Sequence, residues 1–435
     1  MTQTDDPTAL GLVALVDAMA EGRLRPSKAI EAFIARIEAL EPTIQAFAHF
    51  DAGQLREAAR MRDGQPPEGC LYGAPVGIKD VFDTADMPTA YGSDFYADFR
   101  PMADAAAVCR LKEAGALIAG KTVTTEFASV APPKTRNPHH PDFTPGGSSS
   151  GSAAAVAARM VPAALGTQTA GSVVRPAAYC GVVGYKPSFA LLDRTGMKTL
   201  AQSFDTVGIF TRSVADAALV LGALGPRPSL AVPDEARDVR IGLYLPPWCA
   251  LGEACASDVV RHAGTLLREA GFDIADIPAL EGFDRLLEDQ QAIMDWDMVQ
   301  ALSFELDHGG ERLHPVTREA LTVRRQRMSA EKYDAAWAHL DEVGAVLARC
   351  FETVDVLLVP SAPGEAPRGH ANTGSSEFNR GWTSLRVPCI NLPAGFGPNG
   401  MPLGVQLVGP RWRDDVLLAA AAQVERALAG HPYRA

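Results

Sequence analysis

The chain has 435 residues, of which 47% are hydrophobic and 21% are charged, and this composition is typical of a folded globular protein. It excludes collagen-like, coiled-coil and intrinsically disordered proteins. With 52 acidic and 40 basic residues, the formal net charge is −12. Because such a surface repels phosphate groups, we expect neither nucleic acid nor a membrane among the partners.

We also expect no signal peptide, no transmembrane helix and no disulfide bonds. Residues 1–7 are polar and acidic, unlike a signal peptide, and no apolar run approaches the ~18 residues of a transmembrane helix. The seven cysteines form no Cys-x-x-Cys pair, and the nine histidines include no His-Glu-x-x-His motif. We therefore predict a reduced, cytoplasmic protein with no disulfide framework, no metal and no organic cofactor.

Hydrophobic periodicity predicts helices over residues 1–70 and alternating strands and helices after them. Residues 137–151 lack periodicity and are rich in Pro, Gly and Ser, so we expect a loop there. In chain order, the other expected elements are a strand over 74–78, a helix over 105–114, a strand over 116–119, a helix over 152–164, a strand over 241–245, a helix over 258–270, a strand over 272–274, helices within 283–351, strands over 354–359 and 402–408, and a helix over 414–428.

This alternation indicates an α/β fold in which a large mixed β-sheet is sandwiched between layers of α-helices. The sequence shows no internal repeat and no low-complexity linker. We therefore predict a single domain over residues 1–435. Its parts are an N-terminal helical part (1–70), a central core (73–215) and a variable C-terminal part (216–435).

Two familiar motifs occur in unsuitable contexts. Residues 115–122 match the P-loop pattern, but their middle, 116–119, is predicted as a strand, which cannot wrap a phosphate. Residues 147–151 match the G-x-S-x-G pattern around Ser149, but the preceding residues 142–146 form coil instead of the strand that a nucleophile elbow needs. We therefore expect neither nucleotide binding nor a Ser-His-Asp hydrolase.

A lysine and a serine-rich region provide a better chemical candidate. Lys79 ends a buried strand, a Gly/Ser loop spans 146–152, and Ser172 follows several small residues. A serine needs a base to act as a nucleophile, and a buried lysine can serve because burial favours its neutral form. Small residues before Ser172 would let backbone N–H groups stabilise an oxyanion. The residues alone leave two interpretations open: a Ser/Lys hydrolase, or a turn that packs a helix against a sheet.

The order of these segments resembles the amidase signature family. The matching segments are residues 77–80, 120–122 with 126–127, 146–158, 166–181 and 184–187. The resemblance extends over the whole chain and implies the amidase-signature fold. Within the family the chain is most similar to the malonamidases, on segments 205–208, 361–364 and 379–382.

The resemblance implies a Ser–cis-Ser–Lys triad with Ser172 as nucleophile, Ser148 as bridging serine and Lys79 as base. Lys79 would accept a proton through Ser148 while Ser172 attacks the amide carbon. The same relay would protonate the departing ammonia, and water would hydrolyse the acyl-enzyme. The family's bridging serine follows a cis peptide bond. The implied oxyanion hole consists of the backbone N–H groups of Thr169, Ala170 and Gly171.

Several residues depart from the common family pattern. Ala170 and Ser150 stand where glycine is frequent, and Gln168 stands where aspartate is frequent. Because alanine disfavours a positive φ and glycine does not, we do not expect a positive φ at Ala170. The Gln168 substitution changes the hydrogen bonds that hold the loop.

Arg175, three residues after Ser172, matches the arginine that binds the substrate carboxylate in malonamidases. A guanidinium suits that role because it binds both carboxylate oxygens at once. The alternative is an arginine that ties the loop to a nearby acid.

Five further residues have expected roles around the site. We expect Asp80 and Asp205 to hold the site loops by hydrogen bonds and Cys180 to fill the core. Trp382 and Phe143 are candidates for lining the substrate pocket.

The sequence thus predicts an amidase that hydrolyses a linear amide, with a malonamate-like ω-amido acid as the favoured substrate and a homodimer as the expected state. One alternative is the glutaminase (A-type) subunit of a tRNA-dependent amidotransferase, which would need partner subunits. Against it, the chain is shorter than usual, and Val-Val-Arg-Pro at residues 173–176 departs from that group's Ile-Arg-Gln-Pro. The other alternative is a catalytically retired amidase that serves as a binding subunit.

Overall fold

The computed structural model describes residues 6–225 and 238–435, and its centre is a mixed sheet of twelve strands. In spatial order the strands are β1-β3-β2-β4-β6-β5-β10-β11-β9-β7-β8, and β12 pairs with β10. The strands are β1 (Phe47–His49), β2 (Pro75–Lys79), β3 (Leu117–Thr122), β4 (Ala163–Gln168), β5 (Val183–Lys186), β6 (Thr206–Thr211), β7 (Arg240–Leu243), β8 (Asp273–Asp276), β9 (Val356–Pro360), β10 (Cys389–Phe396), β11 (Pro402–Val408) and β12 (Tyr433–Arg434).

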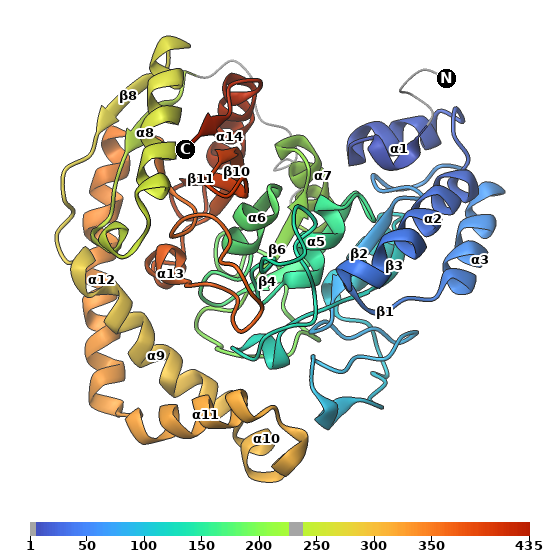
Figure 1. Ribbon diagram of the computed structural model, residues 1–435, viewed down its shortest axis with the longest axis horizontal. Coiled ribbons are helices and arrows are strands. Elements are labelled where there is room, and N and C mark those ends of the chain that lie inside the picture. The colour runs from blue at the N-terminus through green and yellow to red at the C-terminus, as the bar shows by residue number, and fades with distance from the viewer. Residues whose placement is uncertain (1–5, 226–237) are drawn as a thin grey trace.

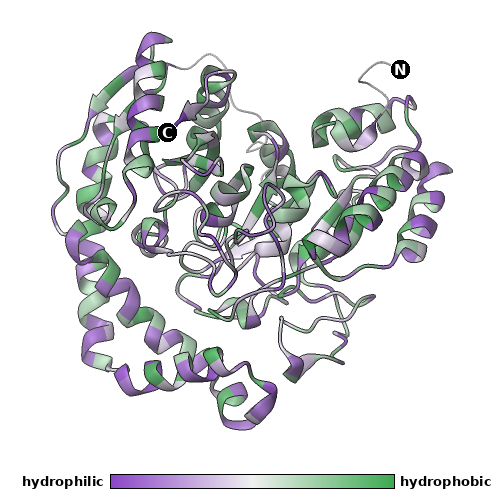
Figure 2. Cartoon of the chain, in the orientation of Figure 1, coloured by the Kyte–Doolittle hydropathy of each residue, from purple (hydrophilic) through white to green (hydrophobic). Residues whose placement is uncertain are grey.

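Helices cover both faces of this sheet (Figure 1). They are α1 (Leu12–Ala20), α2 (Pro26–Ile44), α3 (Ala52–Asp63), α4 (Ala106–Glu113), α5 (Ser150–Ala157), α6 (Val174–Cys180), α7 (Val214–Leu224), α8 (Ala254–Glu269), α9 (Leu286–Ala301), α10 (Ser303–His308), α11 (Pro315–Arg327), α12 (Ala330–Thr353), α13 (Glu377–Ser384) and α14 (Asp414–Leu428). The peripheral helices show both hydrophilic and hydrophobic residues along their ribbons (Figure 2), as helices with one face on a core do.

Around strands β4 and β6, two apolar cores lie on opposite faces of the sheet. Neighbouring residues of β4 divide between them, Ala164 in one core and Leu165 in the other, and so do Phe210 and Ile209 of β6. Since successive strand side chains point to opposite faces, the two clusters lie in different layers in this part of the sheet. At β9 the cluster of Leu165 extends over both faces, because it contains all four residues 356–359. Helices α3, α5 and α6 pack on the face of Ala164, and α1, α4, α7, α8 and α14 pack on the face of Leu165.

The predicted α/β sandwich with a large mixed sheet is confirmed. Strand β11 and helix α14 have the predicted bounds, and β2 lies one residue from its prediction. The four helices α9 to α12 occupy the predicted helical region and form an arm beside the sheet (Figure 1). One sheet contains strands from all three predicted parts of the chain. The single-domain organisation itself stays a prediction.

Two secondary-structure predictions are wrong. The helix expected over residues 152–164 is α5, which ends at residue 157, and residues 163–168 form strand β4. The N-terminal region also contains strand β1. Four further strands, β5, β6, β10 and β12, have no counterpart in the sequence-based prediction. Strands β4, β5 and β6 are buried along their whole length, so they lack the polar–apolar alternation that identifies a half-exposed strand.

The seven cysteines are free thiols, as predicted. Over residues 6–225 and 238–435, none of the helices is both long and apolar enough to cross a membrane. The N-terminal stretch that argues against a signal peptide lies mostly outside the described residues. The cytoplasmic location and the homodimer stay predictions.

Candidate active site

Lys79 lies at the end of β2, beneath the loop that leads into α5. Its ammonium Nζ is 2.7 Å from the Ser148 hydroxyl and 2.7 Å from the Thr167 hydroxyl. The side chain is 0% exposed, and in the described part of the chain no carboxylate forms an ion pair with it. Burial therefore lowers the pKa of Lys79 well below the ordinary lysine value, although the charge of Asp205 acts in the opposite direction.

The loop before α5 presents Ser148 to Lys79 and holds its other serines in place. The Gly147–Ser148 peptide bond is cis. The Ser149 hydroxyl donates to the Thr167 carbonyl and accepts from its N–H, each at 3.2 Å. The Ser150 hydroxyl donates to the Gly146 carbonyl at 2.7 Å. Ser149 is therefore engaged in packing the loop against β4, which agrees with rejecting it as an elbow nucleophile.

Ser172 precedes α6 and lines a cavity of about 300 Å³. Thr169, Ala170 and Arg175 line the same cavity. Among the described residues, the backbone N–H groups of Thr169, Ala170 and Gly171 have no protein acceptor. Thr169 and Ala170 line the cavity together with Ser172, and Gly171 lies between Ala170 and Ser172 in the chain.

The Gln168 side chain fixes the loop around Ser172 through hydrogen bonds. Its side-chain Oε1 accepts from the N–H groups of Val173 and Val174 at 2.8 and 3.0 Å, at the start of α6. Its Nε2 donates to the Thr383 hydroxyl at 3.0 Å, and that hydroxyl donates to the Ala170 carbonyl at 2.7 Å. The glutamine thus links the N-terminus of α6 to α13, which explains how the loop is held without the aspartate frequent in the family.

The small residues before Ser172 serve different purposes. The backbone of Ala170 has no positive φ, so alanine is accommodated there. A Cβ atom on Gly171 would lie 2.6 Å from Oδ1 of Asn379. Glycine at 171 therefore permits the close approach of α13, while Ala170 needs no special conformation.

Asp205 and Asp80 hold loops, as predicted. The Thr169 hydroxyl donates to Asp205 Oδ1 at 2.5 Å, and the N–H groups of Leu200 and Ala201 donate to Oδ2 at 2.8 and 3.0 Å. Burial raises the pKa of Asp205 to about 6. Asp80 accepts from the N–H of Ala90 at 3.2 Å and forms a buried ion pair with Lys121 of β3.

Arg175 is buried on the cavity wall without an acidic partner in the described part of the chain. Its Nη2 donates to the Gly147 carbonyl at 2.6 Å and its Nη1 donates to the Gly374 carbonyl. Its Nε has no partner among the described residues. Burial lowers the pKa of Arg175 to about 10, so it is charged at neutral pH. Arg175 does tie loops together, but through carbonyl oxygens, so the expected alternative of a nearby acid is wrong.

The rest of the cavity wall comes from residues that the sequence did not single out. Gln290, Met294 and Met298 lie four residues apart on α9, and Arg324 and Arg380 come from α11 and α13. The only sequence signal for these residues is the i, i+4 spacing of the three α9 positions. That spacing indicates one face of a helix and gives no sign of a pocket. Cys180 fills the core as predicted.

The two aromatic candidates lie in other places. Trp382 packs against Tyr244, Trp248 and Phe283, and Phe143 belongs to a separate apolar cluster. Neither contributes to the wall of the Ser172 cavity. The prediction that they line it is wrong, because an aromatic residue in coil is as easily buried as exposed to a pocket.

Comparison with known proteins places this site in a family. The family model described as Amidase matches residues 28–418. The chain is 32% identical to the A subunit of the glutamyl-tRNA(Gln) amidotransferase from Roseiflexus castenholzii over 466 aligned residues, which cover 95% of each chain. It superposes on a 6-aminohexanoate cyclic dimer hydrolase with a TM-score of 0.85 and 26% identity, covering 98% of each chain.

A further similar structure is the peptide amidase of Stenotrophomonas maltophilia, with a TM-score of 0.82 and 28% identity, covering 96% of each chain. The likeness to malonamidases stays a prediction. Because the family model and the relatives extend over nearly the whole chain, the protein belongs to the amidase signature family of amide-cleaving enzymes.

Proposed function

We propose that the protein hydrolyses a small carboxamide that also bears a carboxylate, through Ser172, Ser148 and Lys79. The observation that supports this substrate class best is Arg175, a buried guanidinium on the wall of the Ser172 cavity. A buried charge is costly without a counter-ion. Its lack of an acid among the described residues favours a carboxylate supplied by the substrate.

The nucleophile is activated by proton transfer along two hydroxyl groups. Lys79 is held 2.7 Å from Ser148, and burial lowers its pKa, which favours the neutral amine that a base requires. The amine takes the Ser148 proton while Ser148 takes the Ser172 proton, and Ser172 attacks the carboxamide carbon. In the reverse direction the relay protonates the departing ammonia. Water then attacks the acyl-enzyme by the same route and releases the carboxylate.

The developing oxyanion is stabilised by the backbone donors before Ser172. The N–H groups of Thr169, Ala170 and Gly171, which have no acceptor within the described ranges, serve that purpose. Asp205 fixes the Thr169 hydroxyl and Gln168 fixes the start of α6, so the donors are held before the substrate arrives. Preorganised donors of this kind contribute strongly to acyl transfer.

Two substrates of this class are the leading candidates. Glutamine is favoured by the sequence relatives, since those that match over nearly the whole chain include A subunits of amidotransferases. In that case partner subunits and a tRNA would join the reaction, contrary to our expectation of no nucleic acid. Malonamate is favoured by Arg175 and by the residues around it, Val173 and Val174, which depart from the pattern of those subunits.

The test is ammonia release by the purified chain from glutamine, malonamate and propionamide. We expect the carboxylate-bearing amides to be hydrolysed at least about tenfold faster than propionamide, because Arg175 binds their carboxylate. Turnover of glutamine only after addition of amidotransferase partner subunits would establish the glutaminase function. Preference for propionamide would refute the carboxylate requirement.

Ser172→Ala is the control variant that lacks the nucleophile, and it should abolish ammonia release. A fluorophosphonate probe separates a retired amidase from an active one, because only an activated Ser172 reacts with it. Labelling of the wild type but not of Ser172→Ala is the expected result. A homodimer and a cytoplasmic location remain part of this proposal.

A further inference from the structure

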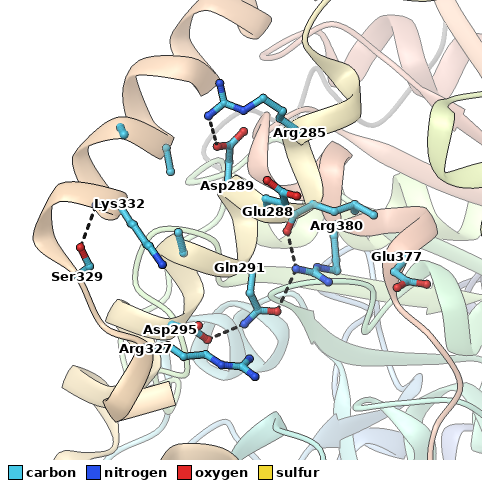
Figure 3. A pocket seen from close by; sticks show the side chains of 14 residues that line it. Arg285, Glu288, Asp289, Gln291, Asp295, Arg327, Ser329, Lys332, Glu377 and Arg380 are labelled. Atoms are coloured by element: carbon cyan, nitrogen blue, oxygen red, sulfur yellow. Dashed lines mark hydrogen bonds and ion pairs between the residues drawn. The ribbon is translucent and has the colours of Figure 1, made fainter. Parts of the chain in front are cut away.

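A second cavity, of about 660 Å³, adjoins the catalytic one. It lies among α9, α11, α12 and α13, in the helical arm (Figure 3). Both cavities are lined by Gln291, Glu377 and Arg380. These three residues therefore form a shared wall, and we call the second cavity the outer cavity.

The shared wall consists of long polar side chains. Arg380 donates to the side-chain oxygens of Gln290 and Gln291 at 2.7 and 3.1 Å. The Gln291 amide in turn donates to Asp295 at 2.5 Å. Gln291 and Arg380 are half-buried, and Arg380 also donates to the Leu287 carbonyl at 2.7 Å. A substrate that spans both cavities would have to displace these two side chains.

The outer cavity is lined by four acids and four bases, and these differ in their partners. The acids Asp289 and Asp295 are engaged by other residues, Asp289 by His339 at 2.6 Å and Asp295 by Arg324. Among the described residues, Arg327 and Lys332 have no acidic partner within ion-pair distance. Figure 3 shows both of them on the α11–α12 side of the cavity, away from Glu377. The far side therefore carries two exposed cations that form no ion pair with a described acid.

The surface between Ser172 and this far side is partly apolar. Met294 and Met298 line the catalytic cavity, and Leu287, Ala292 and Ala336 line the outer one. Apolar walls suit a methylene chain. Glu377, on the shared wall, disfavours a carboxylate at the near end.

We propose that the two cavities together bind the monoamide of a long-chain dicarboxylic acid. Its carboxamide lies at Ser172, its methylene chain passes Gln291 and Arg380, and its carboxylate lies between Arg327 and Lys332. This inference rests on the proposed function, since it uses the same nucleophile. It extends the substrate range from short amido acids, which Arg175 serves, to longer ones such as suberamate.

The test compares kcat/KM for malonamate, adipamate and suberamate in the purified full chain. The variants are Arg327→Ala, Lys332→Ala and the pair together, with Arg325→Ala as the control. Arg325 lies on the same helix as Arg327, pairs with Asp307 at 3.0 Å and does not line either cavity. All three positions are exposed, so folding is retained.

We expect wild-type enzyme to hydrolyse suberamate, and each single variant to lower the suberamate-to-malonamate ratio of kcat/KM by about fivefold. The double variant should lower it further, and Arg325→Ala should not change it. Equal losses for both substrates, or no loss, would overturn the inference.

The two proposals fail in different ways. Turnover of malonamate or glutamine without turnover of suberamate leaves the proposed function intact and refutes the role of the outer cavity. Failure to release ammonia from any of these amides refutes the proposed function and the inference together.

Discussion

Two buried lysines on neighbouring strands show how one residue type takes different roles in this fold. Lys79 ends β2 and Lys121 lies in β3, and both side chains are 0% exposed. The parallel register pairs Lys121 with Ile78 and Lys79 with Thr122. Since paired residues share a face and successive residues alternate, the two lysines project from opposite faces of the sheet. Lys79 points toward α5, and Lys121 points to the other layer.

Their partners differ in charge. Lys121 lies 3.0 Å from Asp80 and 2.5 Å from the Thr89 hydroxyl, so its charge is matched by a buried carboxylate. Lys79 meets the hydroxyl groups of Ser148 and Thr167 instead. Burial lowers the pKa of both lysines, but the neighbouring carboxylate counteracts it directly only at Lys121. Burial alone therefore does not distinguish the proposed base from a structural lysine; the absence of a carboxylate partner at Lys79 among the described residues does.

The largest effect on activity is expected from replacing Lys79, the lysine without a carboxylate partner in the described part of the chain. Lys79→Met should lower kcat/KM for the preferred amide by about 10⁴-fold, because the proton acceptor of the Ser148–Ser172 relay is lost. The free energy of unfolding should change by only about 1 kcal/mol, since no buried acid is left unpaired. Ammonia release and thermal unfolding measure the two quantities. Retention of a tenth of the activity would exclude Lys79 as the base.

The same substitution at the other lysine should act on stability instead. Lys121→Met leaves Asp80 buried without its counter-ion and should lower the free energy of unfolding by about 3 to 5 kcal/mol. Activity per folded molecule should persist, and adding Asp80→Asn should recover part of the stability. Chemical denaturation of the single and double variants measures this. An unchanged midpoint for Lys121→Met would show that the pair contributes nothing.

Arg175 extends the comparison to a buried cation whose partner is proposed to be the substrate. Arg175→Gln should lower kcat/KM for carboxylate-bearing amides by about 10- to 100-fold. Propionamide should lose less, through the weakened contact with the Gly147 carbonyl. Steady-state kinetics on the two substrate types gives the ratio. An equal loss on both would assign Arg175 to loop support alone.

The smallest effect on kcat/KM is expected from replacing Asp205, which influences Lys79 through its charge. The charge of Asp205 raises the pKa of Lys79, so Asp205→Asn should lower that pKa and extend activity to lower pH. Because the pKa of Asp205 is about 6, the wild-type acid is itself protonated below that pH. The two pH profiles of kcat/KM should therefore differ above about pH 6 and converge below it. Superimposable profiles would show that Asp205 acts only through its hydrogen bonds.

The sequence predicts those parts of the molecule where local pattern and structure agree. Helix α14 has a clear apolar face, and β11 is an apolar run with a proline at its start, so the pattern locates both elements correctly. Strand β4, Ala-Ala-Leu-Gly-Thr-Gln, has small residues and no alternation, so the pattern favours the end of a helix there. Its burial on both faces is a property of the assembled sheet.

The candidate site is predictable to a similar extent. The signature motifs lead to Lys79, Ser148 and Ser172 as the proposed catalytic residues, because each lies in a continuous motif. Thr167, which also contacts Lys79, gives no separate signal, since a threonine in a motif is as often structural. The arginine and glutamine side chains of α9, α11 and α13 meet at the cavity only through long-range packing, which no local spacing specifies.

The most direct test of the central claim is the rate at which a fluorophosphonate labels Ser172 as a function of pH, in the wild type and in Lys79→Met. The account predicts that wild-type labelling rises with pH through a pKa well below the value of about 10.4 for an ordinary lysine. It also predicts that this rise disappears in Lys79→Met. An identical pH dependence in both proteins would contradict the assignment of Lys79 as the base.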